Sequence, residues 1–272
     1  MSSMIDKNVK QFALDAFQFP SIGRGAISVW RRNYLYFSQT VLTSLSWIFV
    51  EPLLYLFALG YGLGHFVKEI DGQSYAQFIA PAMMATSGMF VAFFEGTYST
   101  YTKMTRQFTY QTILLSPLES DEIVIGEILW ITTKAFLSCV SVAIVLAALG
   151  LVPVTKLAPA LAILFLMCWV FAAFGVWLST LAKSYEWFSY SQSGLITPMS
   201  LFCGTYFPLQ QLPEFLVYFS YSLPLTHGLM SVRMFLSGDF NSMFFVNLIY
   251  LLASGIFLTN LAAARFERRL IS

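Results

Sequence analysis

The chain has 272 residues, of which 57% are hydrophobic and only 11% are charged. A soluble globular protein carries about 25% charged residues, so this composition excludes an ordinary water-soluble fold. The net charge of +1 gives no reason to expect a nucleic-acid partner, and the positions of the charges are more informative than their sum.

Six long stretches are almost free of charged residues, and each is long enough for a membrane-spanning helix, which needs ~20 apolar residues. They comprise residues 37–60, 78–99, 123–149, 157–181, 189–207 and 244–264. The fifth is the most polar, but without it the basic C-terminal tail would lie on the opposite side from the other basic segments. We therefore predict an all-α integral membrane protein with six transmembrane helices.

The basic residues lie mainly on one side of these six spans. They are Lys7, Lys10, Arg24, Arg31, Arg32, Lys103, Arg106, Lys183, Arg265, Arg268 and Arg269. The positive-inside rule places that side in the cytoplasm, so we expect both termini there. The polar segment 1–23 has no short apolar core before a cleavage site, and we expect span one to be the insertion signal. Residues 37–272 then form one membrane domain.

Residues 24–36 mix basic and apolar positions before the first span. On a helix, Ile27, Trp30 and Tyr34 share one face by their spacing of three and four, and the arginines lie largely elsewhere. This pattern predicts an interfacial helix at the cytoplasmic headgroups. It serves either as plain positive-inside anchoring or as a lever on span one.

The connection 101–122 is expected to contain a short cytoplasmic helix. Met104 and Phe108 pair at a spacing of four, and Pro117 ends the segment. Three acidic residues precede span three, where they stabilise a helix N-terminus. They are Glu119, Asp121 and Glu122. The loop is either purely structural or a docking surface.

The segment between spans five and six has three prolines and two apolar runs, 214–223 and 225–236, that are too short to cross a membrane. We predict re-entrant or interfacial helices on the outer side, with aromatic side chains at the headgroup boundary. The expected outer residues include Tyr206, Phe207, Pro208 and His227.

Several chemistries are excluded by their missing motifs. No glycine precedes a lysine, so no phosphate-binding GxxxxGK[ST] loop is present. The glycine run 60–64 lacks the context of a dinucleotide site or a potassium filter. Only two histidines occur, and neither a metal-ligand cluster nor a catalytic triad is visible. The three cysteines lie in or beside apolar spans and are interpreted as core residues. We expect a protein that is not an enzyme and binds no metal.

Four ionisable residues fall within the predicted spans: Glu51, Glu95, Glu127 and Lys134. Charged groups are costly at membrane depth, so each raises a functional question. Glu127 and Lys134 are seven residues apart on one helix face, and we expect each to pair with a neighbouring helix. The alternatives are structural contacts between helices, a transport path, or a proton relay.

Short motifs occur in a fixed order along most of the chain. They are WRRNYL at 30–35, EPLLYLF at 51–57, the glycine run at 60–64, FE at 94–95, GE at 126–127, SYEWF at 184–188, ITP at 196–198, GTYFP at 204–208, QLP at 211–213 and LPLTH at 223–227. In this order and spacing, the chain from about residue 24 resembles the type 2 ATP-binding-cassette (ABC-2) exporter permeases. It is most similar to the nodulation protein J family.

The resemblance implies a function and an assembly. Such permeases lack their own ATPase site, and two copies join two cytoplasmic ATPase subunits, which bind ATP and Mg. The nodulation protein J family is associated with lipo-oligosaccharide export, so the expected partners are a second copy, the ATPase, membrane lipid and a glycolipid cargo. The expected location is the bacterial inner membrane.

The resemblance also implies roles for three segments. Residues 24–36 would be the gate helix, with Arg24, Trp30, Arg31 and Arg32. Residues 103–116 would be the coupling helix that docks on the ATPase, and residues 208–236 would be the outer re-entrant helices. Family members often carry an acid where this chain has Gln111. The expected ATPase contacts are therefore Lys103, Arg106, Glu119 and Asp121.

Three other functions remain open from the sequence. The same architecture suits export of a hydrophobic drug or a polysaccharide. A channel or secondary transporter driven by an ion gradient is a different class, and the expected discriminator is whether an ATPase partner exists. A membrane enzyme acting on lipid is disfavoured because no catalytic cluster is visible.

Overall fold

The computed structural model describes Pro20, residues 23–41, Leu54, and residues 56–67, 69–70 and 72–271. Most of predicted span one lies outside these residues, as do Glu51 and the segment 1–19.

Helices account for most of the described chain. In order, the elements are α2 (Arg24–Gln39), η1 (Leu56–Gly62), η2 (Leu63–His65), β1 (Glu69–Ile70), β2 (Gln73–Ser74), α4 (Tyr75–Phe94), η3 (Glu95–Ser99), α5 (Thr100–Thr105), α6 (Thr109–Ile113), α7 (Ser120–Ala148), η4 (Val154–Lys156), α8 (Leu157–Leu181), α9 (Glu186–Ser191), η5 (Gln192–Ile196), α10 (Thr197–Phe202), η6 (Leu209–Gln211), α11 (Glu214–Tyr221), α12 (Pro224–Ser237) and α13 (Ser242–Ile271). The two short strands form an antiparallel hairpin in which Glu69 is paired with Ser74.

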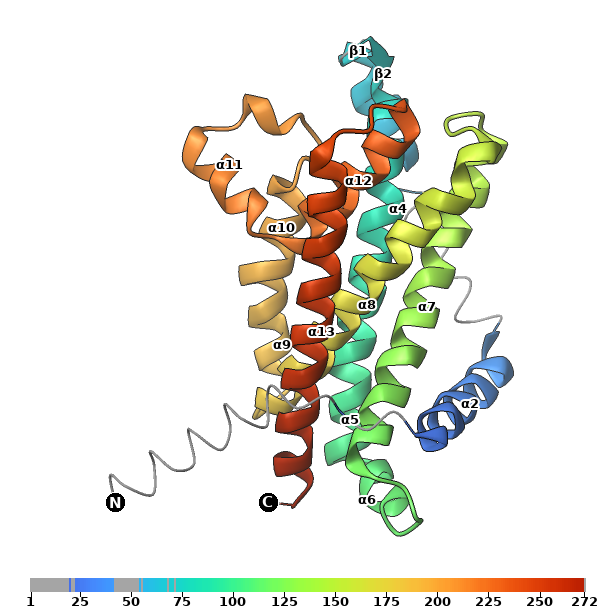
Figure 1. The fold of residues 1–272 in the computed structure, drawn as a ribbon. Helices are drawn as coiled ribbons and strands as arrows, with labels where there is room; N and C mark the ends of the chain where they lie inside the picture. Colours follow the sequence, from blue (N-terminus) through green and yellow to red (C-terminus); the bar gives the residue numbers. More distant parts are fainter. Residues whose placement is uncertain are drawn as a thin grey trace.

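The long helices stand side by side in one bundle (Figure 1). Helix α8 packs against α4, α7, α12 and α13, so it lies at the centre of the core. At one end of the bundle lie α2, α5, α6 and the C-terminus, and we name it the α6 end. The β1–β2 hairpin, α11 and α12 lie at the opposite end, named here the α11 end.

Four helices are long and apolar enough to cross a membrane: Tyr75–Thr105, Ser120–Ala148, Val154–Leu181 and Ser242–Leu270. They coincide with the predicted spans two, three, four and six. At the predicted span five, α9, η5 and α10 follow one another without a break from Glu186 to Phe202, which is shorter than those four helices. The total of six spans stays a prediction, because most of span one lies outside the described residues and the span-five segment is not among the helices long enough to cross.

Glycines allow two close helix crossings. A Cβ atom added to Gly96 would lie 2.8 Å from the Cα of Gly175, so η3 and α8 touch through their backbones. A Cβ added to Gly126 of α7 would lie 2.6 Å from the carbonyl oxygen of Ala26 in α2. Small residues at such crossings are typical of helices packed inside membranes.

The helix that starts at Tyr75 changes geometry at Glu95. Residues Glu95–Ser99 form a π-helical segment, and α-helical geometry resumes at Thr100. Single π turns inside α-helices occur frequently at functional sites. Here the turn begins at one of the ionisable residues predicted at membrane depth.

The predicted helix at 103–116 is wrong as one continuous element. Helix α5 ends at Thr105, and α6 begins at Thr109 after Phe108 adopts a left-handed backbone with φ of 52°. Met104 and Phe108 therefore do not lie on one continuous helix face; Met104 is 3% exposed and Phe108 is 58% exposed. The reversal at Phe108 brings the aromatic ring of Tyr110 into the core, 5.0 Å from the ring of Phe266 in α13.

The outer segment forms two short helices, α11 and α12, close to the apolar runs expected at 214–223 and 225–236. Helix α12 is largely buried against the bundle, whereas Phe215 and Tyr218 of α11 are about 70% exposed. Both helices lie at the α11 end. The arrangement agrees with helices that lie over the end of the bundle and do not cross it.

Candidate functional site

A buried carboxylate joins three elements at the α6 end. Glu127 lies in the second turn of α7, and its side chain is 0% exposed. Its Oε1 accepts a hydrogen bond from Arg32 Nη2 of α2 at 3.0 Å, and its Oε2 accepts one from Lys103 Nζ of α5 at 2.7 Å. The expected pairing of Glu127 with a neighbouring helix is confirmed, and two helices contribute.

Asn33 completes this network. Its Oδ1 accepts hydrogen bonds from Arg32 Nη2 at 2.9 Å and from Lys103 Nζ at 3.2 Å. A buried charge is tolerated only when it is paired and hydrogen-bonded, and both carboxylate oxygens meet that condition here. Because the groups come from α2, α5 and α7, movement of any one element strains the others. We name Arg32, Asn33, Lys103 and Glu127 the Glu127 network.

A second carboxylate links the beginnings of α2 and α7. Glu122 Oε1 accepts a hydrogen bond from the backbone N–H of Gly25 at 3.1 Å. Its Oε2 accepts one from the N–H of Glu119 at 3.2 Å. Helix N-termini favour negative charge, so one side chain stabilises both. Glu122 was not predicted as a site residue; the spacing from Glu119 to Glu122 matches that of a capping box and could have indicated it.

Aromatic rings hold the remaining length of α2 against α7. The indole nitrogen of Trp30 donates to Thr133 Oγ1 at 3.1 Å. The rings of Trp30, Tyr34 and Phe37 lie 5.5–6.5 Å from the ring of Trp130. Helix α2 is therefore attached along its length, by Glu122 at its start, by the Glu127 network in its middle and by Trp130 towards its end.

The face of α2 that points away from α7 is exposed and carries both basic and apolar side chains. Arg24 and Arg31 are exposed, as are Ile27, at 63%, and Tyr36, at 74%. A helix that is buried on one side and carries exposed arginines and apolar groups on the other suits the membrane headgroup region.

Tyr110 lies beneath the Glu127 network on the short helix α6. Its burial raises the pKa of the hydroxyl well above the ordinary value of 10.0, and the negative charge of Glu127 raises it further. Next to it, Gln111 Nε2 donates to the carbonyl oxygen of Met104 at 3.2 Å. Gln111, which stands where members of the resembled family often have an acid, therefore binds the chain's own backbone.

A second ion pair lies deeper in the bundle. Lys134 of α7 binds Glu95, the first residue of the π-helical segment, and the two side chains are 17% and 23% exposed. The Lys134 ammonium also lies 5.7 Å from the centre of the Phe37 ring. Two of the four predicted intramembrane ionisable residues therefore bind each other.

At the α11 end, His227 joins α12 to its neighbours. Its Nε2 donates to the carbonyl oxygen of Tyr221 at 2.8 Å, and its Nδ1 lies 2.7 Å from Asn247 Oδ1. The imidazole stacks on the ring of Tyr250 with 3.9 Å between centres. These contacts make His227 a structural contact between α12, α13 and the end of α11.

The other outer residues lie close by. The backbone carbonyl of Tyr206 accepts from the Tyr75 hydroxyl at 3.2 Å, Phe207 is half-buried and Pro208 is buried.

The predicted ATPase contacts differ in their exposure to solvent. Arg106 and Glu119 are exposed, Asp121 is half-buried, and the ammonium of Lys103 points into the Glu127 network. Docking by these residues stays a prediction, and the exposed members are the better placed for it. Within the described residues, no group of three or more His, Cys, Asp and Glu side chains could hold a metal ion.

Comparison with known proteins identifies the family. Residues 24–237 match the model of the ABC-2 type transporter family. The chain is 38% identical to nodulation protein J of Rhizobium meliloti (strain 1021) over 220 residues, which cover 81% of this chain and 84% of the relative. It is 35% identical to nodulation protein J of Bradyrhizobium diazoefficiens over 246 residues, which cover 90% of this chain and 93% of the relative. The chain therefore belongs to the ABC-2 type transporter family, as a membrane protein of that family.

Proposed function

We propose that the chain is the permease subunit of an ATP-driven exporter that moves a lipo-oligosaccharide or related glycolipid out across the bacterial inner membrane. The family membership carries this proposal, together with the similarity to nodulation protein J over most of the chain. The α6 end faces the cytoplasm, where the basic residues gather. A separate ATPase subunit binds ATP and Mg, and two copies of it join two copies of this chain.

The Glu127 network is the route by which ATPase movement reaches the spans. Helix α6 and the turn at Phe108 protrude at the α6 end (Figure 1) and offer exposed groups, including Arg106, to a cytoplasmic partner. A push on this loop moves α5, and Lys103 on α5 is bonded to the same carboxylate as Arg32 on α2. The gate helix and the loop therefore move together.

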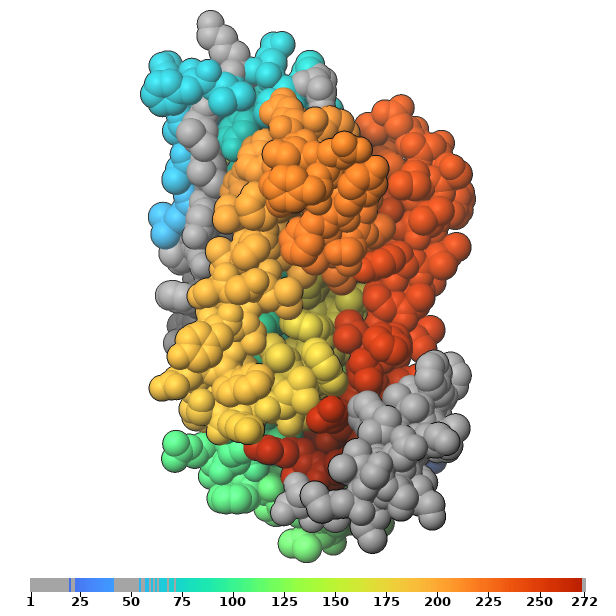
Figure 2. Space-filling view, turned by 90° about the vertical axis from the view of Figure 1, so that its left-hand side faces the viewer, coloured from blue at the N-terminus to red at the C-terminus, as the bar shows by residue number. Residues whose placement is uncertain are grey.

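The exposed face of the fifth predicted span supports a homodimer. Polar or small residues lie exposed along it, namely Ser189, Tyr190, Ser193, Gly194 and Thr197. The elements that carry them, α9, η5 and α10, form part of the face seen in Figure 2, below α11. Lipid tails offer these groups no hydrogen bonds, so contact with a second copy of the chain or with a water-filled path is more favourable than contact with lipid.

Co-purification in mild detergent tests the proposal, using the ATPase encoded nearest this gene. We expect a complex of two plus two subunits that hydrolyses ATP. Arg106→Glu should weaken the complex, and Arg31→Glu is the matched control because Arg31 is also exposed at the α6 end. A folded chain that binds no cassette ATPase, with transport that follows a proton or sodium gradient, would refute the proposal in favour of a secondary transporter.

A further inference from the structure

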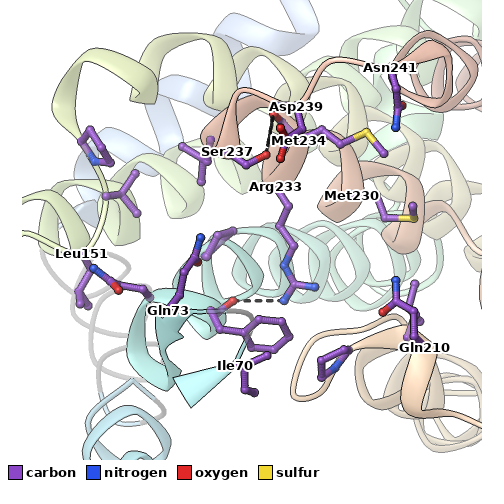
Figure 3. A pocket seen from close by; sticks show the side chains of 18 residues that line it. Ile70, Gln73, Leu151, Gln210, Met230, Arg233, Met234, Ser237, Asp239 and Asn241 are labelled. Carbon is purple, nitrogen blue, oxygen red and sulfur yellow. Dashed lines mark hydrogen bonds between the residues drawn. The ribbon is translucent and has the colours of Figure 1, made fainter. Parts of the chain in front are cut away.

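The α11 end contains a pocket of about 670 Å³, which is separate from the Glu127 network and from the pair of Glu95 and Lys134 (Figure 3). Three separate connections of the chain build it: the hairpin with the start of α4, the turn between α7 and α8, and the segment from Pro208 to Asn241. Its volume falls within the range of about 300–1,000 Å³ that is typical of small-molecule sites.

The floor and the rim of the pocket differ in chemistry. The floor is apolar and buried, with Phe78, Val152 and Leu209 each less than 10% exposed. The rim is polar and exposed, and its polar members are Gln73, Gln77, Gln210, Ser237, Asp239 and Asn241. Four of these six carry side-chain amides, each of which both donates and accepts hydrogen bonds.

Arg233 projects from α12 into the middle of the pocket (Figure 3). Its Nη2 donates to the carbonyl oxygen of Phe78 at 3.2 Å, and its guanidinium lies 4.1 Å from the centre of the Phe78 ring. These two contacts fix the guanidinium plane across the apolar floor. A planar donor group next to an aromatic ring suits the hydroxyl edge and the apolar face of a sugar ring.

Pro81 leaves a backbone carbonyl without its helical donor beside the pocket. It lies inside α4 and has no N–H, so the carbonyl of Gln77, four residues earlier, lacks its usual helical donor. Both residues line the pocket. A ligand with hydroxyl groups can supply that donor.

The charge balance favours a neutral ligand over an anion. Arg233 and Asp239 are the charged side chains that line the pocket, one of each sign. A phosphate site would gather positively charged groups and hydrogen-bond donors, whereas the Asp239 carboxylate would repel a phosphate. A purely apolar ligand would leave the amides of the rim unsatisfied.

We propose that this pocket binds the saccharide portion of the cargo, a neutral oligosaccharide, on the outer side of the membrane. The choice of cargo rests on the proposed function, whereas the pocket and its chemistry do not. Because three connections form the walls, a bound sugar links α4, the turn between α7 and α8, and α12 at the end where the cargo leaves.

The test is direct binding of soluble probes to the purified chain in nanodiscs, measured by saturation-transfer NMR and calorimetry without any ATPase. The probes are cellotetraose, tetra-N-acetylchitotetraose and inorganic phosphate; the second presents amides to the amides of the rim. We expect at least one tetrasaccharide to bind and phosphate not to compete with it.

Two variants locate the binding. Gln73→Ala with Gln210→Ala removes two rim amides and should weaken the binding about tenfold. Ser237→Trp should abolish it by filling the pocket. The matched control is Gln211→Ala, because Gln211 is exposed in the same short turn as Gln210 but does not line the pocket. Its affinity should equal that of the wild type.

The possible results separate the two proposals. If an ATPase complex forms but neither tetrasaccharide binds, the pocket assignment is overturned and the exporter stands. If a tetrasaccharide binds, Gln73→Ala with Gln210→Ala weakens that binding and Ser237→Trp abolishes it, the assignment holds even when no ATPase co-purifies. Binding that keeps wild-type affinity in both pocket variants, or that phosphate displaces, overturns the assignment.

Discussion

Glu127→Gln should loosen the attachment of α2 to the bundle. Removing one member of a buried ion pair costs about 3–5 kcal/mol. The Arg32 and Lys103 side chains are 36% and 16% exposed, so both cations can turn towards water, and we expect the lower end, about 3 kcal/mol. This free energy corresponds to roughly a hundredfold change in an equilibrium constant. Amide hydrogen exchange within α2 should therefore accelerate about a hundredfold if the helix opens locally.

Three further variants make this measurement specific. Arg32→Met and Lys103→Met each leave Glu127 with one cation, and each should cost about 1.5–3 kcal/mol, the range for a hydrogen bond to a charged group. Arg31→Met is the matched control, because Arg31 is the neighbouring residue on α2 and is exposed. Acceleration below about threefold in Glu127→Gln, or an equal effect of Arg31→Met and Arg32→Met, would show that the network does not hold α2.

Two other predictions concern the core. The pKa of Tyr110 is raised in the folded chain, so above about pH 10 the unfolded state loses a proton that the folded state keeps, and the free energy of unfolding should fall as the pH rises. Tyr110→Phe should remove this part of the fall. The measurement is unfolding from pH 8 to 12, and the control is Tyr36→Phe, because Tyr36 is 74% exposed. Gly175→Ala should lower the stability measured by thermal unfolding by about 1–3 kcal/mol, because the added Cβ would lie 2.9 Å from the Cα of Gly96. Gly194→Ala should be tolerated, since a Cβ added there meets nothing within 4 Å.

The sequence predicted the elements whose cause is local. Charge-free stretches predicted six spans, and four of them coincide with helices long and apolar enough to cross a membrane, because this property depends on length and hydrophobicity alone. The helix at 24–36 followed from its spacing of apolar and basic residues, and the structure extends it to Gln39. The two outer helices followed from short apolar runs between prolines.

What could not be predicted depends on contacts between distant residues. Arg32 and Glu127 are 95 positions apart, and the packing of α2 on α7, in which Gly126 allows a close approach, brings them together. The break at Phe108 also has a distant cause, because burial of Tyr110 against Phe266 turns the chain where periodicity favours one helix. The pocket around Arg233 combines three connections, and no single one of them carries a recognisable motif.

The pair of Glu95 and Lys134 allows a structural role to be separated from a transport role. Either Glu95→Gln or Lys134→Met alone leaves a partner with an unpaired polar group or charge, and we expect a loss of about 3 kcal/mol in unfolding. Replacing both members of a buried pair by apolar residues of similar size is often neutral or stabilising. The double variant Glu95→Leu/Lys134→Met should therefore recover the stability of the wild type.

Transport by that double variant decides between the two roles. If the pair only holds η3 against α7, restored stability should bring restored export, since the apolar residues fill the same space. If the pair lines the path or must open during each cycle, the double variant should be stable and inactive, because apolar side chains neither attract a polar cargo nor exchange partners. The π-helical turn that begins at Glu95 favours the second result, because it places a locally irregular backbone beside the only ion pair that joins Glu95 to another helix within the described residues.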